Sequence, residues 1–195
     1  MDEELVIKAI KRVMSPQRFL HSLGVQDTAE KLAAKYGADV KKASLAGLLH
    51  DYARDLENSS LLKKSIDFSM SINEVERLAP VLLHGRIGAK LVQEELGIDD
   101  DEVLSSISYH TTGTLSMTLL QQIIYVADYI EPSRDFPGVQ KIREATWNNL
   151  DLGTLEAFEH TLSYLLERKV LIHPATVEGR NFLLSKLYIN RNGGQ

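Results

Sequence analysis

An adjacent histidine and aspartate, His50 and Asp51, lie inside an apolar helical repeat at residues 45–56. Apolar side chains recur here three and four residues apart, which predicts one helix with a buried face and with the pair near its middle. These side chains are Leu45, Leu48, Leu49, Tyr52 and Leu56. Burying an imidazole and a carboxylate together is costly unless a partner satisfies them, and a metal cation would do so. For an isolated pair, a neighbouring side chain or water is the more common partner.

Helical spacing continues along the chain and is interrupted by glycines and prolines. Ser15-Pro16 predicts the cap and first residue of a helix that runs to Gly37. Further helices are predicted to start at Asp39, Ser71, Asp99, Ser116 and Val139. Another is predicted from Asp151 to Lys169, and the last at residues 177–189. Because no strand series is convincing, we predict an all-α, single-domain bundle of about eight to ten helices. The domain would span residues 1–195, with a motif-bearing core at about 16–131 and C-terminal helices at about 139–190 packed on it.

Composition narrows the chemistry that the chain can perform. The chain has 195 residues, 44% of them apolar, which suits a substantial core, and it has no cysteine, so any metal must be held by His, Asp or Glu. A net charge of −5 argues against general affinity for a nucleic-acid polymer but leaves a small polyphosphate ligand open. No secretory-signal pattern and no apolar run of membrane-spanning length occur, so a cytoplasmic protein without a membrane partner is expected.

Further metal-ligand side chains are spread over other predicted helices. His21, His84, His110 and Asp128 each lie in or at the end of a different helix, and Asp128 follows an inward apolar face. Helical bundles form metal sites where facing helices project ligands inward, and an unpaired inward carboxylate would be destabilising. A nitrogen and oxygen ligand set without sulfur fits iron, manganese, cobalt or zinc, and the pattern does not choose among them.

The order His, His-Asp, Asp on separate helices resembles the HD-domain phosphohydrolase superfamily. Four segments carry a closer resemblance, to the bacterial YqeK-type symmetrical diadenosine tetraphosphate hydrolases, and they span about residues 18–181. They are residues 46–56, Tyr109-His110-Thr111-Thr112-Gly113, residues 127–134 and residues 173–181. The chain departs from the family pattern at Arg54, where a lysine is frequent, and at Gly179, where an alanine is expected.

The resemblance implies roles for individual residues. The metal ligands would be His21, His50, Asp51 and Asp128, while His84 and His110 would hold a second metal or contact phosphate. Iron is the expected ion, divalent or of mixed valence, with one or two ions bound. Asp51, His84 and His110 would be catalytic. The substrate-binding residues would be Arg18, Arg54, His84, His110, Thr111, Arg134, Arg180 and Asn181.

The implied reaction is attack by a metal-activated water on a central phosphorus of diadenosine tetraphosphate, which gives two ADP. Spacing alone indicates only metal-assisted phosphoester or phosphoanhydride hydrolysis. The alternatives are an HD-type nucleotidase or phosphodiesterase with another nucleotide substrate, and a catalytically silent nucleotide-binding module. The expected partner is a small nucleotide or dinucleoside polyphosphate, and a homodimer is compatible with the sequence. We expect Trp147, Phe158 and Tyr164 in the core and His160 in a structural role or at the surface, and we assign no role to His173.

Overall fold

The structure is a computed structural model that describes residues 3–192 and holds eleven α-helices and one 3-10 helix. No strand occurs within these residues, which confirms the all-α prediction. The helices are α1 (Glu3–Val13), α2 (Pro16–Tyr36), α3 (Val40–Leu49), α4 (Asn58–Asp67), α5 (Glu74–Leu78), η1 (Pro80–Leu83), α6 (His84–Leu96), α7 (Asp101–Tyr109), α8 (Leu119–Ile130), α9 (Val139–Asn148), α10 (Leu150–Glu167) and α11 (Pro174–Asn192).

The predicted start and end of α2 and the predicted start of α3 are confirmed. The Ser15 hydroxyl accepts a hydrogen bond from the Arg18 amide at 3.4 Å, and Pro16 is the first residue of α2. Gly37 ends α2 in the left-handed conformation, with φ of 76°, which glycine adopts without strain. Asp39 caps α3 by accepting from two backbone amides.

Several later boundaries differ from the predicted ones by one to three residues. The N-caps are Asn73, Asp100, Thr118 and Asn149, whereas we predicted starts at Ser71, Asp99, Ser116 and Asp151. In each case the true cap is the polar side chain that reaches an orphan amide two or three residues on, and neighbouring polar residues make that choice ambiguous in a sequence. Helix α4 was not predicted, and α11 begins at Pro174, before the predicted residue 177.

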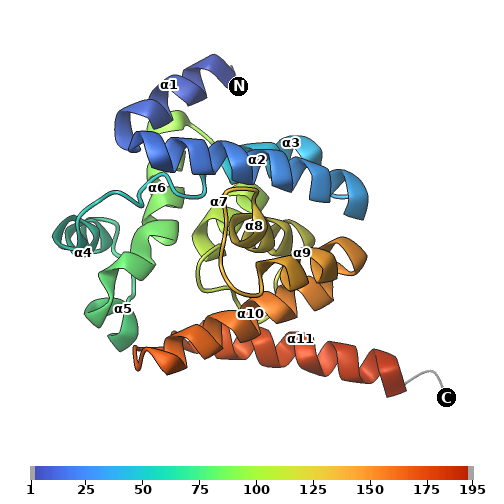
Figure 1. The fold of residues 1–195 in the computed structure, drawn as a ribbon. Coiled ribbons are helices and arrows are strands. Elements are labelled where there is room, and N and C mark those ends of the chain that lie inside the picture. The colour runs from blue at the N-terminus through green and yellow to red at the C-terminus, as the bar shows by residue number, and fades with distance from the viewer. Residues whose placement is uncertain (1–2, 193–195) are drawn as a thin grey trace.

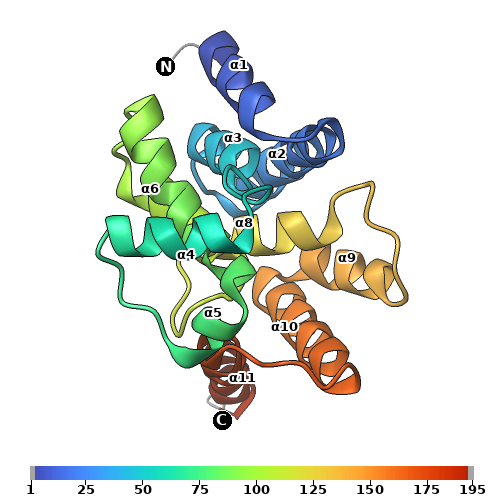
Figure 2. The same ribbon diagram turned by 90° about the vertical axis from the view of Figure 1, so that its left-hand side faces the viewer.

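Helix α8 lies at the centre of the bundle and packs against α2, α3, α7, α9 and α10 (Figure 1). Side chains on nearly every side of α8 are buried, as expected for a helix enclosed by others. Helices α4 and α5 lie on the side of the bundle opposite α9 in Figure 1 and face the viewer in Figure 2, and α10 and α11 pair with each other at one end. None of the helices within residues 3–192 combines the length and apolar character that a bilayer crossing needs.

The prediction that His50 and Asp51 lie mid-helix was wrong. Helix α3 ends at Leu49, and the chain continues through consecutive turns, in which the Tyr52 amide donates to the Leu49 carbonyl and the Arg54 amide donates to the Asp51 carbonyl. These bonds span three residues and tighten the chain after the helix, while the apolar spacing stays nearly helical. Both side chains of the pair are nevertheless buried, so the pair faces the core from the end of a helix.

Candidate metal centre

Six side chains from five parts of the chain meet beside α8, and we call them the His/Asp cluster: His21, His50, Asp51, His84, His110 and Asp128. His21 Nε2 lies 2.9 Å from Asp128 Oδ1, and His50 Nε2 lies 3.4 Å from Asp51 Oδ2. His84 Nε2 lies 3.2 Å from Asp51 Oδ1. The predicted convergence of these residues is therefore present in the fold.

Three of the histidines are fixed in one orientation by a backbone carbonyl. The Nδ1 atoms donate to carbonyls three residues upstream, at 2.7 Å for His50, 2.6 Å for His84 and 2.8 Å for His110. Each of these histidines ends or begins a helix, where backbone carbonyls remain available to side-chain donors. Since Nδ1 carries the proton of the neutral ring, the Nε2 lone pairs all face the cluster, as in metal-ligating histidines.

Glu131 holds the fourth histidine and was not among our predicted site residues. Its Oε1 lies 3.0 Å from His21 Nδ1, and its Oε2 accepts from the Ser133 amide at 2.7 Å. Glu131 is 1% exposed, and Gly24 on α2 leaves room for it, because a Cβ at Gly24 would lie 2.6 Å from Oε2. This carboxylate fixes the ring of His21 and turns its Nε2 toward Asp128.

The donor atoms of the cluster fit a metal ion. His50 Nε2 is fully buried and has no hydrogen-bond partner among the described residues. His84 Nε2 and His110 Nε2 face each other at 3.0 Å, an arrangement of lone pairs that calls for a proton or a cation. Three sets of donor atoms lie within 4.8 Å of one another: His21, His50 and Asp51; His50, His110 and Asp128; and Asp51, His84 and His110.

Asp51 belongs to two of these sets and presents a different oxygen to each. Its Oδ2 faces His50 and also accepts from Arg18 Nη1 at 2.7 Å. Its Oδ1 faces His84 at 3.2 Å and His110 at 3.5 Å. The Asp51 carboxylate is therefore placed to ligate a cation on either side of the cluster.

The electrostatics of the cluster also suit a cation. Burial alone would raise the pKa of Asp51, but the neighbouring imidazoles, His50 first and then His110 and His84, hold it well below the usual value. Burial alone would lower the pKa of His50, but the carboxylates of Asp51 and Asp128 raise it above the usual value. Burial lowers the pKa of His84, which favours the neutral ring that a metal requires. A bound cation would replace these protons as the partner of the carboxylates.

Three of the predicted substrate-binding residues outside the histidines reach the cluster. Arg18 pairs with Asp51, Arg134 Nη2 pairs with Asp128, and the Thr111 hydroxyl lies 3.0 Å from His110 Nε2 and 3.2 Å from His84 Nε2. Both guanidinium groups are partly exposed, so they face solvent as well as the carboxylates.

The side chains of Arg54, Arg180 and Asn181 form no hydrogen bond or ion pair with the cluster within residues 3–192. Arg54 forms no ion pair among the described residues, and Arg180 pairs with Glu159 at 2.6 Å and with Asn181 at 3.2 Å. The neighbouring position 179 has no room for the alanine that the family pattern predicts. A Cβ on Gly179 would lie 2.8 Å from both Phe158 Cζ and the Thr114 carbonyl oxygen. Close approach of α11 to α10 and to the loop before α8 thus explains this departure from the family pattern.

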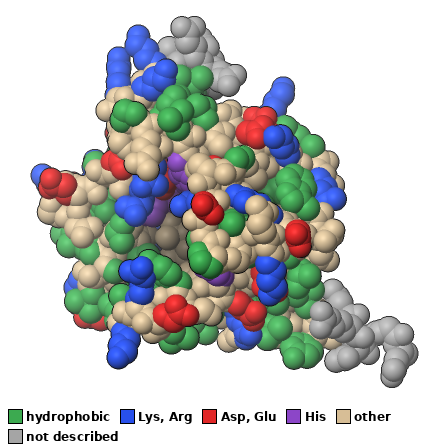
Figure 3. Space-filling view, in the orientation of Figure 1, with side chains coloured by type: hydrophobic (Ala, Val, Ile, Leu, Met, Phe, Trp, Pro, Cys, Tyr) green, Lys and Arg blue, Asp and Glu red, His purple; other side chains and the backbone are tan. Residues whose placement is uncertain are grey.

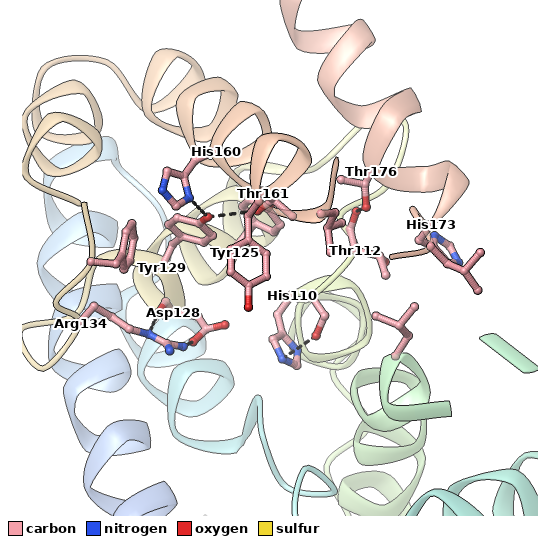
Figure 4. Close-up of a pocket in the computed structure, with 16 residues that line it drawn as sticks. His110, Thr112, Tyr125, Asp128, Tyr129, Arg134, His160, Thr161, His173 and Thr176 are labelled. Atoms are coloured by element: carbon pink, nitrogen blue, oxygen red, sulfur yellow. Dashed lines mark hydrogen bonds and ion pairs between the residues drawn. The ribbon is translucent and has the colours of Figure 1, made fainter. Parts of the chain in front are cut away.

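Two cavities adjoin the cluster. The aromatic cavity, of about 530 Å³, lies between α8 and α10, and besides cluster residues it is lined by Tyr125, Tyr129, Phe136, His160 and Tyr164 (Figure 4). The arginine cavity, of about 630 Å³, is lined by Arg18, His21, Glu131 and residues 133–136. Arg134 and Phe136 border both cavities. Figure 3 shows a hollow in this face with histidine inside it and basic side chains around it.

Comparison with known proteins agrees with this geometry. The HD domain family matches residues 18–133. "Bis(5'-nucleosyl)-tetraphosphatase, symmetrical" of Bacillus subtilis is 36% identical over 185 residues, 95% of this chain and 99% of the relative, and the protein of that name from Halalkalibacterium halodurans is 38% identical over 94% and 98%. A crystal structure of a "predicted HD superfamily hydrolase involved in NAD metabolism" from Clostridium acetobutylicum has a TM-score of 0.93 and 36% identity, and covers 95% of this chain and 98% of its own. The chain therefore belongs to the HD-domain family and, within it, to the group that contains the symmetrical bis(5'-nucleosyl)-tetraphosphatases.

Proposed function

We propose that this protein is a metal-dependent hydrolase that cleaves diadenosine tetraphosphate symmetrically into two ADP. Three relatives of this name, 34–38% identical, match at least 93% of the chain. The observation that carries the proposal is the His/Asp cluster, in which four Nε2 atoms and two carboxylates face one another beside two cavities.

The ligands of one ion would be His21, His50, Asp51 and Asp128. Asp51 would share a second ion with His84 and His110, because its two oxygens face both sides of the cluster. Iron is our first choice for the metal, with manganese, cobalt and zinc compatible with the same donors. Such an ion, when bound, acts as a Lewis acid that makes water a better nucleophile near neutral pH and offsets phosphate charge.

The surrounding residues would bind and orient the polyphosphate. Arg18 and Arg134 stand on opposite carboxylates of the cluster, and Arg18 Nε has no hydrogen-bond partner among the described residues. Their guanidinium groups would exchange a carboxylate oxygen for a phosphate oxygen and stabilise the charge on the departing ADP. Thr111 and, with a single ion, His84 and His110 would contact phosphate from the other side.

The two cavities support cleavage at the centre of the substrate. Each has a volume in the range of small-molecule sites, about 300–1,000 Å³. A tetraphosphate lying across the cluster would place one ADP moiety in the aromatic cavity and the other in the arginine cavity, with the middle bridging oxygen over the ligands. We further propose that residues 1–195 form one domain, since α10 packs directly on α8 and borders the site. Cytoplasmic location and a homodimer stay predictions.

Product analysis tests the proposed function. The metal-loaded protein, incubated with diadenosine tetraphosphate, should release ADP as the sole nucleotide product; AMP together with ATP would contradict symmetric cleavage. His50→Ala and Asp51→Ala should lose both metal and turnover but keep a helical circular dichroism spectrum. A panel of nucleoside monophosphates and cyclic dinucleotides separates the other HD-type activities, and binding without turnover of any of them would indicate a silent module.

A further inference from the structure

The hydroxyl of Tyr125 is a buried polar group without a partner. Tyr125 is 2% exposed, and its hydroxyl forms no hydrogen bond to any described residue. It lies on α8 three residues before Asp128, so the two side chains share a face of the helix. Figure 4 shows the hydroxyl pointing into the aromatic cavity, between Asp128 and His110.

Packing holds the ring of Tyr125 in this direction. Its centroid lies 4.6 Å from that of Phe158 and 6.5 Å from that of Tyr129, which stacks beside it. The Tyr129 hydroxyl, by contrast, is fully used, because it lies 2.6 Å from His160 Nδ1 and 3.2 Å from Thr161 Oγ1. A buried phenol normally has a hydrogen-bond partner, so the unpaired hydroxyl of Tyr125 indicates that a polar ligand binds in this cavity.

The side chains around the Tyr125 hydroxyl indicate the chemistry of that ligand. A phenol, whose ordinary pKa is about 10, is protonated at neutral pH and offers a donor. The neighbouring Thr111 and Arg134 also bring donors to this cavity, and Asp128 is already paired with His21 and Arg134. Several donors that converge beside a cation site suit an anion with several acceptor oxygens.

We propose that Tyr125 donates a hydrogen bond to a phosphate oxygen of the nucleotide that occupies the aromatic cavity. This inference rests on the proposed function, since it assumes that a nucleotide end lies there. Tyr125 would thus be a substrate-binding residue that positions one phosphate against the His/Asp cluster. The proposal predicts that the hydroxyl contributes to nucleotide binding and not to the stability of the fold.

Two tyrosine-to-phenylalanine variants separate these contributions. Tyr125→Phe removes a hydroxyl with no protein partner, whereas Tyr36→Phe removes one that donates to the Thr146 carbonyl, away from both cavities. The measurements are thermal midpoint, metal content, ADP affinity by calorimetry, and turnover of diadenosine tetraphosphate. For Tyr125→Phe we expect an unchanged or higher midpoint, unchanged metal content, and ADP affinity and kcat/KM reduced about 10- to 100-fold, as for a lost hydrogen bond to a charged group. Tyr36→Phe should lower the midpoint and leave binding and turnover unchanged.

The outcomes also distinguish this inference from the proposed function. If the unaltered protein binds ADP but does not cleave diadenosine tetraphosphate, the proposed function fails and the calorimetric comparison still decides the role of Tyr125. Unaltered ADP affinity and turnover in Tyr125→Phe would overturn the inference, as would loss of metal in that variant. Absence of ADP binding by the unaltered protein would overturn it as well.

Discussion

Replacing Glu131 by glutamine tests whether the carboxylate behind His21 sets the metal affinity. Glu131 uses both oxygens, because Oε1 faces His21 Nδ1 at 3.0 Å and also accepts from the Ser133 hydroxyl, while Oε2 accepts from the Ser133 amide at 2.7 Å. Glutamine has the same shape but only one acceptor oxygen. In the variant, either the donors at Oε1, which are His21 and the Ser133 hydroxyl, or the Ser133 amide at Oε2 would face an NH₂ group. His21 would also lose its charged partner.

The size of the effect follows from these contacts. A partner that holds a metal-ligating histidine is typically worth about 10- to 100-fold in metal affinity or activity, or about 1.4–2.8 kcal/mol. Leaving one buried donor unpaired costs about 1–3 kcal/mol, so the two estimates agree. We expect Glu131→Gln to weaken metal binding by one to two orders of magnitude, with a matching fall in hydrolysis at limiting metal.

Competition with a chelator measures the metal affinity, and the hydrolysis rate is followed as metal is added back. Glu159→Gln is the matched control, because it removes the charge of a partly exposed residue that pairs with Arg180 on the surface of α10 and α11. Such pairs contribute about 0–1 kcal/mol, so this variant should bind metal normally. A Glu131→Gln protein that retains the metal as tightly as the unaltered protein would refute the reasoning.

Three further predictions follow from the same geometry. Gly24→Ala should weaken metal binding without unfolding α2, since the added Cβ would lie 2.6 Å from Glu131 Oε2; unchanged affinity in the chelator assay would contradict this. Gly179→Ala should lower the thermal midpoint because its Cβ would press on Phe158, at a cost of about 1–3 kcal/mol typical of overpacking, and a midpoint equal to that of the unaltered protein would count against it. Removing the metal with a chelator should also lower the midpoint, by an amount that depends on metal concentration, as binding to the folded state alone requires.

Several residues of the His/Asp cluster were predictable because they interrupt an apolar pattern. A histidine or aspartate among inward-facing residues is a local contradiction that a functional site explains. His50, Asp51 and Asp128 were found in this way, even though the helix predicted to hold the first two ends at Leu49. The residue types and their order were sufficient to predict that these side chains meet, and the exact helix ends were not required.

Contacts between distant segments were not predictable from the same patterns. Tyr125 reads as one more residue of an apolar helix, and only the fold shows that its hydroxyl enters a cavity beside α10. The predicted core position is confirmed for Phe158, which is fully buried, but is wrong for Trp147 and Tyr164, which are 37% and 48% exposed. Large aromatic residues on a helix do not reveal whether the facing surface is another helix or a cavity. The predicted structural role suits His160, which lies between Tyr129 and the Pro137 carbonyl, and His173 lies beside Asn73.

Glu131 illustrates a signal that sequence reasoning could have used. It occupies the C-cap of α8, where the helix dipole disfavours a negative charge. An acidic residue in that position needs a compensating partner, and the fold supplies His21 and the donors of Ser133. The same argument that identifies buried ligands, an unfavourable residue that only a specific partner can justify, therefore extends to the carboxylate behind them. Within this fold, the unfavourable charge at the end of α8 and the His/Asp cluster are two parts of one arrangement, because Glu131 and His21 are each other's partners.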